Sequence, residues 1–470
     1  MIHPYDKASK WSILEYSKRL LNKTLEEAII PDQIEDQFRG KGRLGQLVEK
    51  YFFGYDINSN QEADFSEAGL ELKCTPLKEL ATKALAIKER LVLTMIDFSE
   101  DHKKPFEKSH VYVKCMFMLI LFYLHEAGVP VQQLKFIYSV LWQIPQKDLL
   151  IMKQDYETII DKIKAGKAHE LSEGDTTYLG ACRKGQKGDA NVVYTLPNGE
   201  KSEIPAPKRA FSLKTQYMRT ILEFAQKTCG QGTYNTSAIV GGYGAQLITE
   251  QELMAKSFEN ILLDRFKPYF GLTYNELVKA LGCEGSKAKS KYFLVANEIL
   301  TEKGSRGVDV TKSEEFKKSG IIIKTIRLKA NGSSAEAMSF ENINYFDIMK
   351  EEEWYESRLY DIFTGRFLFI VFQENEREET ILKNAFFWTM SVGDLEIAEE
   401  YWKNIKKNVE DNHISPEYFY KASDRKNFHV RPKAQKATDV TANPHGGSVK
   451  KFCYWFNKEY IKQIVEQNLR

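Results

Sequence analysis

The sequence predicts a mixed α/β protein made of two tandem domains, each with a central mixed β-sheet flanked by helices. The first observation is length, since 470 residues exceed one typical domain. The second is that segments with helical spacing of apolar residues alternate with apolar runs typical of buried strands. The third is that several segments recur in the same order in the second half. We expect domains over residues 1–228 and 251–470, joined by a linker over residues 229–250.

Composition places the chain among ordinary globular proteins. A hydrophobic fraction of 43% and an aromatic fraction of 12% suffice for packed cores. The net charge of +2 does not by itself indicate a nucleic-acid-binding protein. DNA binding would therefore require basic residues gathered on one surface. The six cysteines include no C-x-x-C pair, so neither a zinc site nor a disulfide framework is indicated.

No membrane partner is expected, because the most apolar run, residues 115–124, is shorter than the ~20 residues of a membrane span. The N-terminus also lacks the apolar core of a signal peptide. A cytoplasmic location is therefore expected.

The strongest chemical signal lies between Asp64 and Lys73, where apolar and charged residues alternate with period two. As a strand, this stretch turns Leu70 and Leu72 to one side and Glu71 and Lys73 to the other. Asp64 can join them from the preceding loop. Two converging carboxylates form a hard oxygen site of the kind Mg²⁺ prefers, and a neighbouring lysine can orient water or stabilise phosphate charge. The alternative is a Glu–Lys pair on a solvent-exposed strand.

Two further charged residues belong to segments near this motif. Glu49 lies in a predicted helix within residues 44–53, from which its carboxylate can face the motif. Lys114 stands in the apolar run 109–122, which predicts a buried central strand. A lysine there needs a carboxylate or phosphate partner, unless it sits at a strand edge and its amine reaches water.

Basic residues gather at two places later in the first half. Arg183 and Lys184 follow a predicted strand, and residues 208–214 precede a predicted helix over residues 215–225. Such residues suit contacts with DNA phosphates and groove edges. The alternative is a solvated basic face.

The internal repeat keeps the apolar frame but loses charged residues. Residues 315–324 align with residues 64–73, with Glu315 in place of Asp64 and Ile322 in place of Glu71. Residues 366–372 echo 116–122, which puts Thr364 in place of Lys114. Residues 429–434 and 451–455 echo the two basic segments. A metal site used once per molecule explains this asymmetry; a chance echo of apolar strands is the alternative.

These residues resemble the MutH-type family, which comprises the mismatch-repair strand-nicking endonuclease and two-domain, Sau-type restriction endonucleases that cut at GATC. The resemblance spans the first half in order and the second half more loosely. Its segments are Gly45–Glu49, Asp64–Pro76, Phe106–Lys114, His169–Leu179 and Arg209–Lys214.

The resemblance implies two restriction-endonuclease-like domains arranged as a pseudo-dimer, the second one catalytically degenerate. It implies that Asp64 and Glu71 hold Mg²⁺ with help from Glu49, and that Lys73 and Lys114 position the attacking water and the scissile phosphate. The DNA-binding residues that we expect are Arg183, Lys184, Arg209, Ser212, Lys214, Arg431 and Lys433. Ser212 stands where the mismatch-repair member has a tyrosine.

The function that follows is Mg²⁺-dependent double-strand cleavage of DNA by a type II restriction endonuclease, with a cognate DNA methyltransferase as genetic partner. We expect a monomer that acts as a pseudo-dimer, whose second domain binds another DNA site or half-site. A strand-nicking repair enzyme and a non-cleaving DNA-binding protein remain as alternatives.

Overall fold

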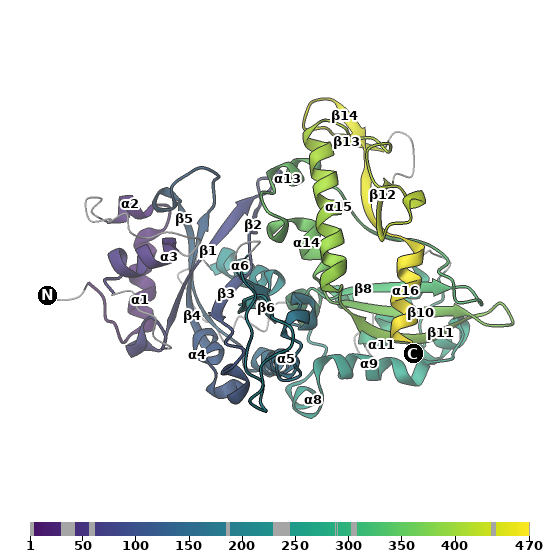
Figure 1. The fold of residues 1–470 in the computed structure, drawn as a ribbon, viewed down its shortest axis with the longest axis horizontal. Helices are drawn as coiled ribbons and strands as arrows, with labels where there is room; N and C mark the ends of the chain where they lie inside the picture. Colours follow the sequence, from purple (N-terminus) through teal and green to yellow (C-terminus); the bar gives the residue numbers. More distant parts are fainter. Residues whose placement is uncertain are drawn as a thin grey trace. The chain divides into compact units, whose positions relative to one another are not determined.

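The chain divides into two units, each with a mixed β-sheet and an antiparallel sheet (Figure 1). The computed structural model describes residues 4–29, 43–55, 62–184, 189–228, 245–286, 288, 290–301, 308–433 and 439–469. The first unit comprises residues 1–244 and 317–319, and the second comprises residues 245–316 and 320–470. Most of the predicted linker lies outside the described residues, and Ala245 onward belongs to the second unit.

The mixed sheet of the first unit has the strand order β2-β1-β4-β5. Its two central strands are parallel to each other, and both edge strands are antiparallel to their neighbours. The strands are β1 (Glu71–Glu79), β2 (Leu85–Ile87), β4 (Phe117–Leu124) and β5 (Phe136–Gln143).

Helices cover both faces of this sheet because its strands are apolar on both sides. Leu119 and Leu121 pack into a cluster with α1 (Lys10–Ser17) and α3 (Arg43–Leu47). Trp142 of β5 projects from the opposite face and meets Tyr217 of α6 (Thr215–Thr228) edge to face, with ring centroids 6.3 Å apart. This alternation is what period two in a doubly covered strand requires.

A separate antiparallel sheet, of order β3-β7-β6, completes the first unit. The prediction of one central sheet per domain is therefore too simple. Its strands are β3 (Leu91–Met95), β7 (Arg209–Leu213) and β6 (Leu179–Arg183). The remaining helical elements are α2 (Leu25–Ala28), the π-helical turn η3 (Val48–Phe52), the 3-10 turn η4 (Ser66–Ala68), α4 (His110–Met116) and α5 (Gln146–Lys164).

The run 109–122 is not one strand, contrary to our prediction. It forms α4 and then enters β4. The helix begins where the Ser109 hydroxyl accepts a hydrogen bond from the backbone N–H of Tyr112 at 3.2 Å. A serine cap satisfies a donor that the first helical turn would otherwise leave unpaired. Lys114 therefore lies on the last turn of a helix.

The second half of the chain contains a mixed sheet, an antiparallel sheet and a hairpin. The mixed sheet β11-β10-β8 comprises β8 (Ile322–Leu328), β10 (Phe367–Glu374) and β11 (Thr380–Trp388). The antiparallel sheet β12-β15-β9 comprises β9 (Met338–Asn342), β12 (Phe428–Pro432) and β15 (Phe452–Phe456). The hairpin pairs β13 (Val440–Ala442) with β14 (Ser448–Lys450). The helices are α8 (Glu250–Ala255), α9 (Phe258–Phe266), α10 (Tyr274–Leu281), α11 (Lys291–Thr301), α12 (Glu314–Ser319), α13 (Tyr345–Lys350), α14 (Arg358–Phe363), α15 (Val392–Glu410) and α16 (Lys458–Asn468).

The two units share the pairing of their main strands, although the edge strand β2 of the first unit has no counterpart among the described strands of the second. In the second unit β8 runs parallel to β10 and β11 runs antiparallel to it, as β1 and β5 do with β4. β15 lies between β9 and β12 as β7 lies between β3 and β6. Trp388 meets Tyr460 edge to face with centroids 6.2 Å apart, which matches the Trp142–Tyr217 contact. The internal repeat is thus a repeat of fold.

The structure corrects the register of two echoes. The N-cap serine of α14 is Ser357, and the place of Lys114 is taken by Ile362 when counted from this cap or by Phe363 when counted back from β10, both of them apolar. Thr364 is the C-cap of α14, so it does not take the place of Lys114. In the other echo, Phe452 opposes Pro432 as Arg209 opposes Arg183, so Phe452 and not Lys451 corresponds to Arg209.

No helix in the described ranges is long and apolar enough to cross a membrane.

A buried carboxylate fixes the entry to β6. Asp155 of α5 accepts hydrogen bonds from the backbone N–H groups of Thr177 at 2.6 Å, Tyr178 at 2.6 Å and Leu179 at 2.9 Å. Burial raises the pKa of this carboxyl, and the nearby Lys214 amine lowers it. The Asp155 carboxylate thereby fixes the start of the strand that leads to Arg183 and Lys184.

We predict that Asp155→Ala lowers the free energy of unfolding by about 3 kcal/mol or more, because several buried N–H groups lose their acceptor. Asp155→Asn keeps one acceptor oxygen and should cost less. Urea denaturation of both variants measures the difference. Equal stability of Asp155→Ala and the wild type would show that these hydrogen bonds are not needed.

Candidate active site

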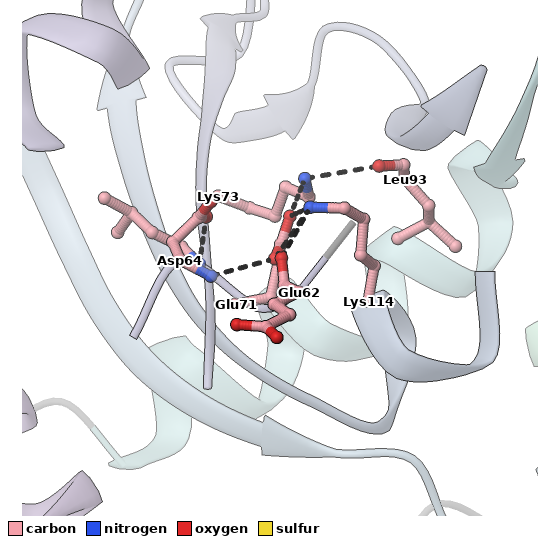
Figure 2. A network of polar contacts seen from close by, with 7 residues as sticks. Glu62, Asp64, Glu71, Lys73, Leu93 and Lys114 are labelled. Carbon is pink, nitrogen blue, oxygen red and sulfur yellow. Dashed lines mark hydrogen bonds and ion pairs between the residues drawn. The ribbon is translucent and has the colours of Figure 1, made fainter. Parts of the chain in front are cut away.

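The predicted acidic motif forms a compact polar centre around Glu71, the first residue of β1 (Figure 2). The Glu71 side chain is only 1% exposed. The Lys73 amine donates to its Oε1 at 2.6 Å, and the Lys114 amine reaches Oε1 at 2.9 Å and Oε2 at 3.1 Å. A buried carboxylate requires such partners, since an unpaired charge in the interior is costly.

A tight turn brings Asp64 to this centre. Phe65 and Leu70 pair across the turn, and Gly69 adopts a left-handed conformation with φ of 58°. Glycine adopts this conformation without the steric penalty of a Cβ. Asp64 then accepts a hydrogen bond from the Leu72 N–H at 2.9 Å, and its own N–H lies 3.4 Å from Glu71 Oε2. These backbone contacts hold both acidic residues at the entry to β1, where their negative charges act on each other.

The two lysines come from different elements and are anchored on backbone carbonyls. Lys73 also donates to the carbonyl of Leu93 on β3 at 3.4 Å, and Lys114 of α4 donates to the carbonyl of Glu62 at 3.5 Å. Their side chains are 16% and 14% exposed, respectively. Both amines are thus held in place yet remain reachable from solvent. Sequence reasoning did not find the two carbonyls, because no side-chain pattern marks a backbone acceptor.

Glu49 lies on the turn η3 within electrostatic range of the centre. Burial, followed by the negative charges of Asp64 and Glu71, raises the pKa of Glu49 to about 7. Burial and Glu71 likewise raise the pKa of Asp64, against the opposing effects of Lys73, the Leu72 N–H and Lys114. Crowded carboxylates with raised pKa values gain from an added cation, so the donor chemistry fits a hard divalent metal ion.

The three-carboxylate ligand set that we predicted is not preformed. Within the described residues, no three His, Cys, Asp or Glu side chains are grouped closely enough to hold a metal ion. The Asp64 backbone N–H contacts the Glu71 carboxylate and the Asp64 carboxylate accepts the Leu72 N–H, whereas Glu49 meets both acids only through its electrostatic field. These two carboxylates are therefore the residues best placed to hold a metal.

We predict that divalent-metal affinity rises as the pH rises toward 7. Between the ordinary value of 4.5 and the raised value of about 7, folded Glu49 keeps a proton that an unfolded chain loses, so protein stability falls as pH rises through this window. A metal ion must displace that proton, which gives up to about tenfold stronger binding per pH unit below 7. Titration calorimetry with Ca²⁺ at several pH values measures the slope. Glu49→Gln should flatten it, and an unchanged slope in that variant would exclude Glu49 as its source.

The predicted DNA-binding residues divide into accessible and buried groups. Arg183 is exposed at the end of β6, and Lys184 follows it half-buried. In the second unit Arg431 and Lys433 are both exposed at the end of β12. Lys214 is half-buried and donates to the carbonyl of Thr176.

Arg209 and Ser212 are buried, which does not suit the direct DNA contact that we predicted. Arg209 is 6% exposed and donates to the carbonyl of Ala181 at 2.9 Å, and Ser212 is 0% exposed beside the carbonyl of Gly180. The reason is that β7 is the middle strand of its sheet and is covered along its whole length. Their observed contacts support the strands that carry Arg183.

The second unit keeps the shape of this centre without its acids. Glu315 stands in place of Asp64, but it is buried and accepts the N–H groups of Leu247 at 3.0 Å and Ile248 at 3.1 Å. Ile322 replaces Glu71 at the start of β8, and an apolar residue of α14, Ile362 or Phe363 according to the register used, replaces Lys114. Lys324 is retained in place of Lys73. A cation would find no carboxylate pair at these positions.

The site has an acid pair followed by a lysine at the start of a strand in a mixed sheet. This arrangement is typical of metal-dependent endonucleases. The family model described as DNA mismatch repair enzyme MutH matches residues 53–155. The type II restriction enzyme Sau3AI of Staphylococcus aureus is 30% identical over 478 aligned residues, which cover 92% of this chain and 94% of that protein. The chain therefore belongs to the family of MutH-type endonucleases that includes this restriction enzyme, and it is a site-specific deoxyribonuclease.

Mismatch-repair relatives match a smaller part of the chain. The DNA mismatch repair protein MutH of Shewanella woodyi is 28% identical over 187 residues, covering 40% of this chain and 78% of that protein. That of Vibrio vulnificus is 28% identical over 190 residues, covering 40% and 81%. The restriction-enzyme relative spans both units, so the restriction class fits better than the repair class.

Proposed function

We propose that the first unit cuts both strands of DNA with Mg²⁺ bound by Asp64 and Glu71. The recognition sequence proposed is GATC, on the basis of the family resemblance. The observation that carries this proposal is the convergence of the Lys73 and Lys114 amines on the buried Glu71 carboxylate beside Asp64. An acid pair and two cations at one point are the groups that phosphodiester hydrolysis needs.

The roles of the side chains follow from their positions. When bound, a divalent cation neutralises phosphate charge and makes water a better nucleophile. Lys73 and Lys114 can exchange Glu71 for phosphate oxygens as acceptors, because both side chains are partly exposed. One amine then positions the scissile phosphate and the other holds the attacking water. Glu49, with its pKa of about 7, tunes the charge of the pocket.

We predict that Asp64→Ala and Glu71→Ala each abolish plasmid cleavage while DNA binding in Ca²⁺ persists, because each variant loses a cation-holding carboxylate but keeps the DNA-binding cations. Ile322→Ala in the second unit is the matched control, since Ile322 occupies the place of Glu71. It should cut normally apart from any loss of stability. Retained cleavage by purified Glu71→Ala would remove this centre as the catalytic one.

We further propose that the second unit binds DNA without cutting it, as an effector site for a second recognition sequence or as half of a pseudo-dimer. Support comes from its repeated strand connectivity, its lack of the acid pair, and the exposed cations Arg431 and Lys433. We also propose a monomeric protein and a cognate methyltransferase partner. Digestion of methylated and unmethylated plasmid with end mapping tests the site and its protection.

We predict that Arg431→Ala and Lys433→Ala weaken DNA binding or two-site stimulation of cleavage, because each removes an accessible cation. The plot of log affinity against log salt concentration has a negative slope. Each lost phosphate contact should make this slope less steep by about 0.9. Binding measured across a salt series gives this slope, with exposed Lys407→Ala as the charge-matched control. Wild-type behaviour of the paired variant at elevated salt would contradict a DNA-binding role for this unit.

Accumulation of nicked plasmid in place of double-strand breaks would favour a nicking enzyme.

A further inference from the structure

One place in the second unit corresponds to the catalytic centre of the first. It keeps lysine but lacks the carboxylate that neutralises lysine in the first unit. Lys324 occupies the position of Lys73, and Ile322 occupies that of Glu71. The Lys324 amine donates to the carbonyl of Ser339 on β9 at 2.7 Å and lies 4.7 Å from the Phe340 ring centroid. It forms no ion pair with any residue in the described part of the chain.

A second lysine reaches the same strand. Lys433, the residue after β12, donates to the carbonyl of Phe340 at 2.9 Å, and Phe340 directly follows Ser339 in β9. Burial, followed by the positive charge of Lys433, lowers the pKa of Lys324 to about 8, so like charge acts on this amine from the second lysine. An anion between them would remove this repulsion.

Aromatic residues and a third cation border the two lysines. The guanidinium carbon of Arg431 lies 4.1 Å from the ring centroid of Trp455, which pairs across the sheet with Ser339 and with His429. The Trp455 indole nitrogen and both His429 ring nitrogens are buried and meet no hydrogen-bond partner among the described residues. Buried polar atoms in native proteins are almost always partnered, so this region has donors to spare.

We propose that this degenerate centre of the second unit is a phosphate site, in which Lys324 and Lys433 hold an uncleaved phosphodiester of DNA. The proposal deepens the DNA-binding role proposed for the second unit and rests on it. Two ammonium groups attract the negatively charged phosphate oxygens. Because the acid pair is absent, the site gains phosphate affinity but lacks the groups that hold a catalytic cation. The bordering Arg431 extends the positive surface along the backbone.

Protection of lysine amines from acylation tests the site directly. The full-length protein is treated with acetic anhydride in Ca²⁺, alone, with a GATC duplex and with inorganic phosphate, and modified peptides are quantified by mass spectrometry. We expect the duplex to slow acylation of Lys324 by about tenfold when about nine-tenths of the sites are occupied. Exposed Lys407 on α15 is the internal control and should react equally in every arm.

Restoring the lost acid gives the matched variants. Ile322→Glu places a carboxylate where Glu71 stands in the first unit, so it should pair with Lys324 and abolish protection by the duplex. Ile322→Gln has the same shape without the charge and should retain protection. If Ile322→Glu does not fold, two other variants test the site. Lys324→Met should make the salt dependence of DNA binding less steep by about 0.9 in slope, and Lys324→Arg should leave the slope unchanged.

The outcomes separate this inference from the proposed function. Protection by both phosphate and duplex supports both. Protection by phosphate alone keeps the anion site but overturns its occupation by DNA. If Arg431→Ala weakens DNA binding while Lys324 stays unprotected in every arm, the second unit binds DNA elsewhere and the phosphate site is refuted.

Discussion

The first unit depends on one buried carboxylate held between two amines. Glu71 is almost fully buried, so its charge is tolerated only because Lys73 and Lys114 lie within 3.1 Å of it. The same contacts fix two long and otherwise mobile side chains in one place. Strand β1 and helix α4 are thereby tied together at the point where phosphate chemistry is proposed. Structural support and functional positioning are a single interaction here, because the amines that neutralise Glu71 are those that would face the substrate.

Local pattern was enough to predict the acidic motif. Alternation with period two correctly put Leu70 in the core and Glu71 on the opposite face, and the glycine in the preceding turn allows Asp64 to return. Short-range sequence contains all of this information. A left-handed glycine also precedes β8 in the second unit, where Gly320 caps α12 with a φ of 64°. Glycine suits both places because other residues rarely adopt this conformation.

Long-range pairing explains where sequence reasoning failed. An apolar run does not distinguish a strand from a buried helix, and only the capping Ser109 marks α4. The burial of Ser212 depends on β7 being a middle strand, which is decided by partners far along the chain. The echoes slipped by a residue or two for a similar reason. Phe-rich strands look alike in every register, whereas the N-cap serines align the two helices and the Trp–Tyr contacts align the two sheets.

The difference between the two units is best understood as a change in charge balance on a constant frame. In the first centre Asp64 and Glu71 contribute −2 and Lys73 and Lys114 contribute +2, and Glu49, with its pKa of about 7, adds part of a further negative charge, so a cation can enter without meeting net positive charge. In the second, Ile322 and Ile362 are neutral and the acid Glu315 is occupied by backbone N–H groups. Lys324 remains, and Lys433 joins it on β9. Loss of the acid while the lysine is kept turns a centre suited to metal ions into one that repels them and attracts phosphate. A purely structural remnant would have no need of a half-buried ammonium without a counter-charge, since burial of such a group is costly.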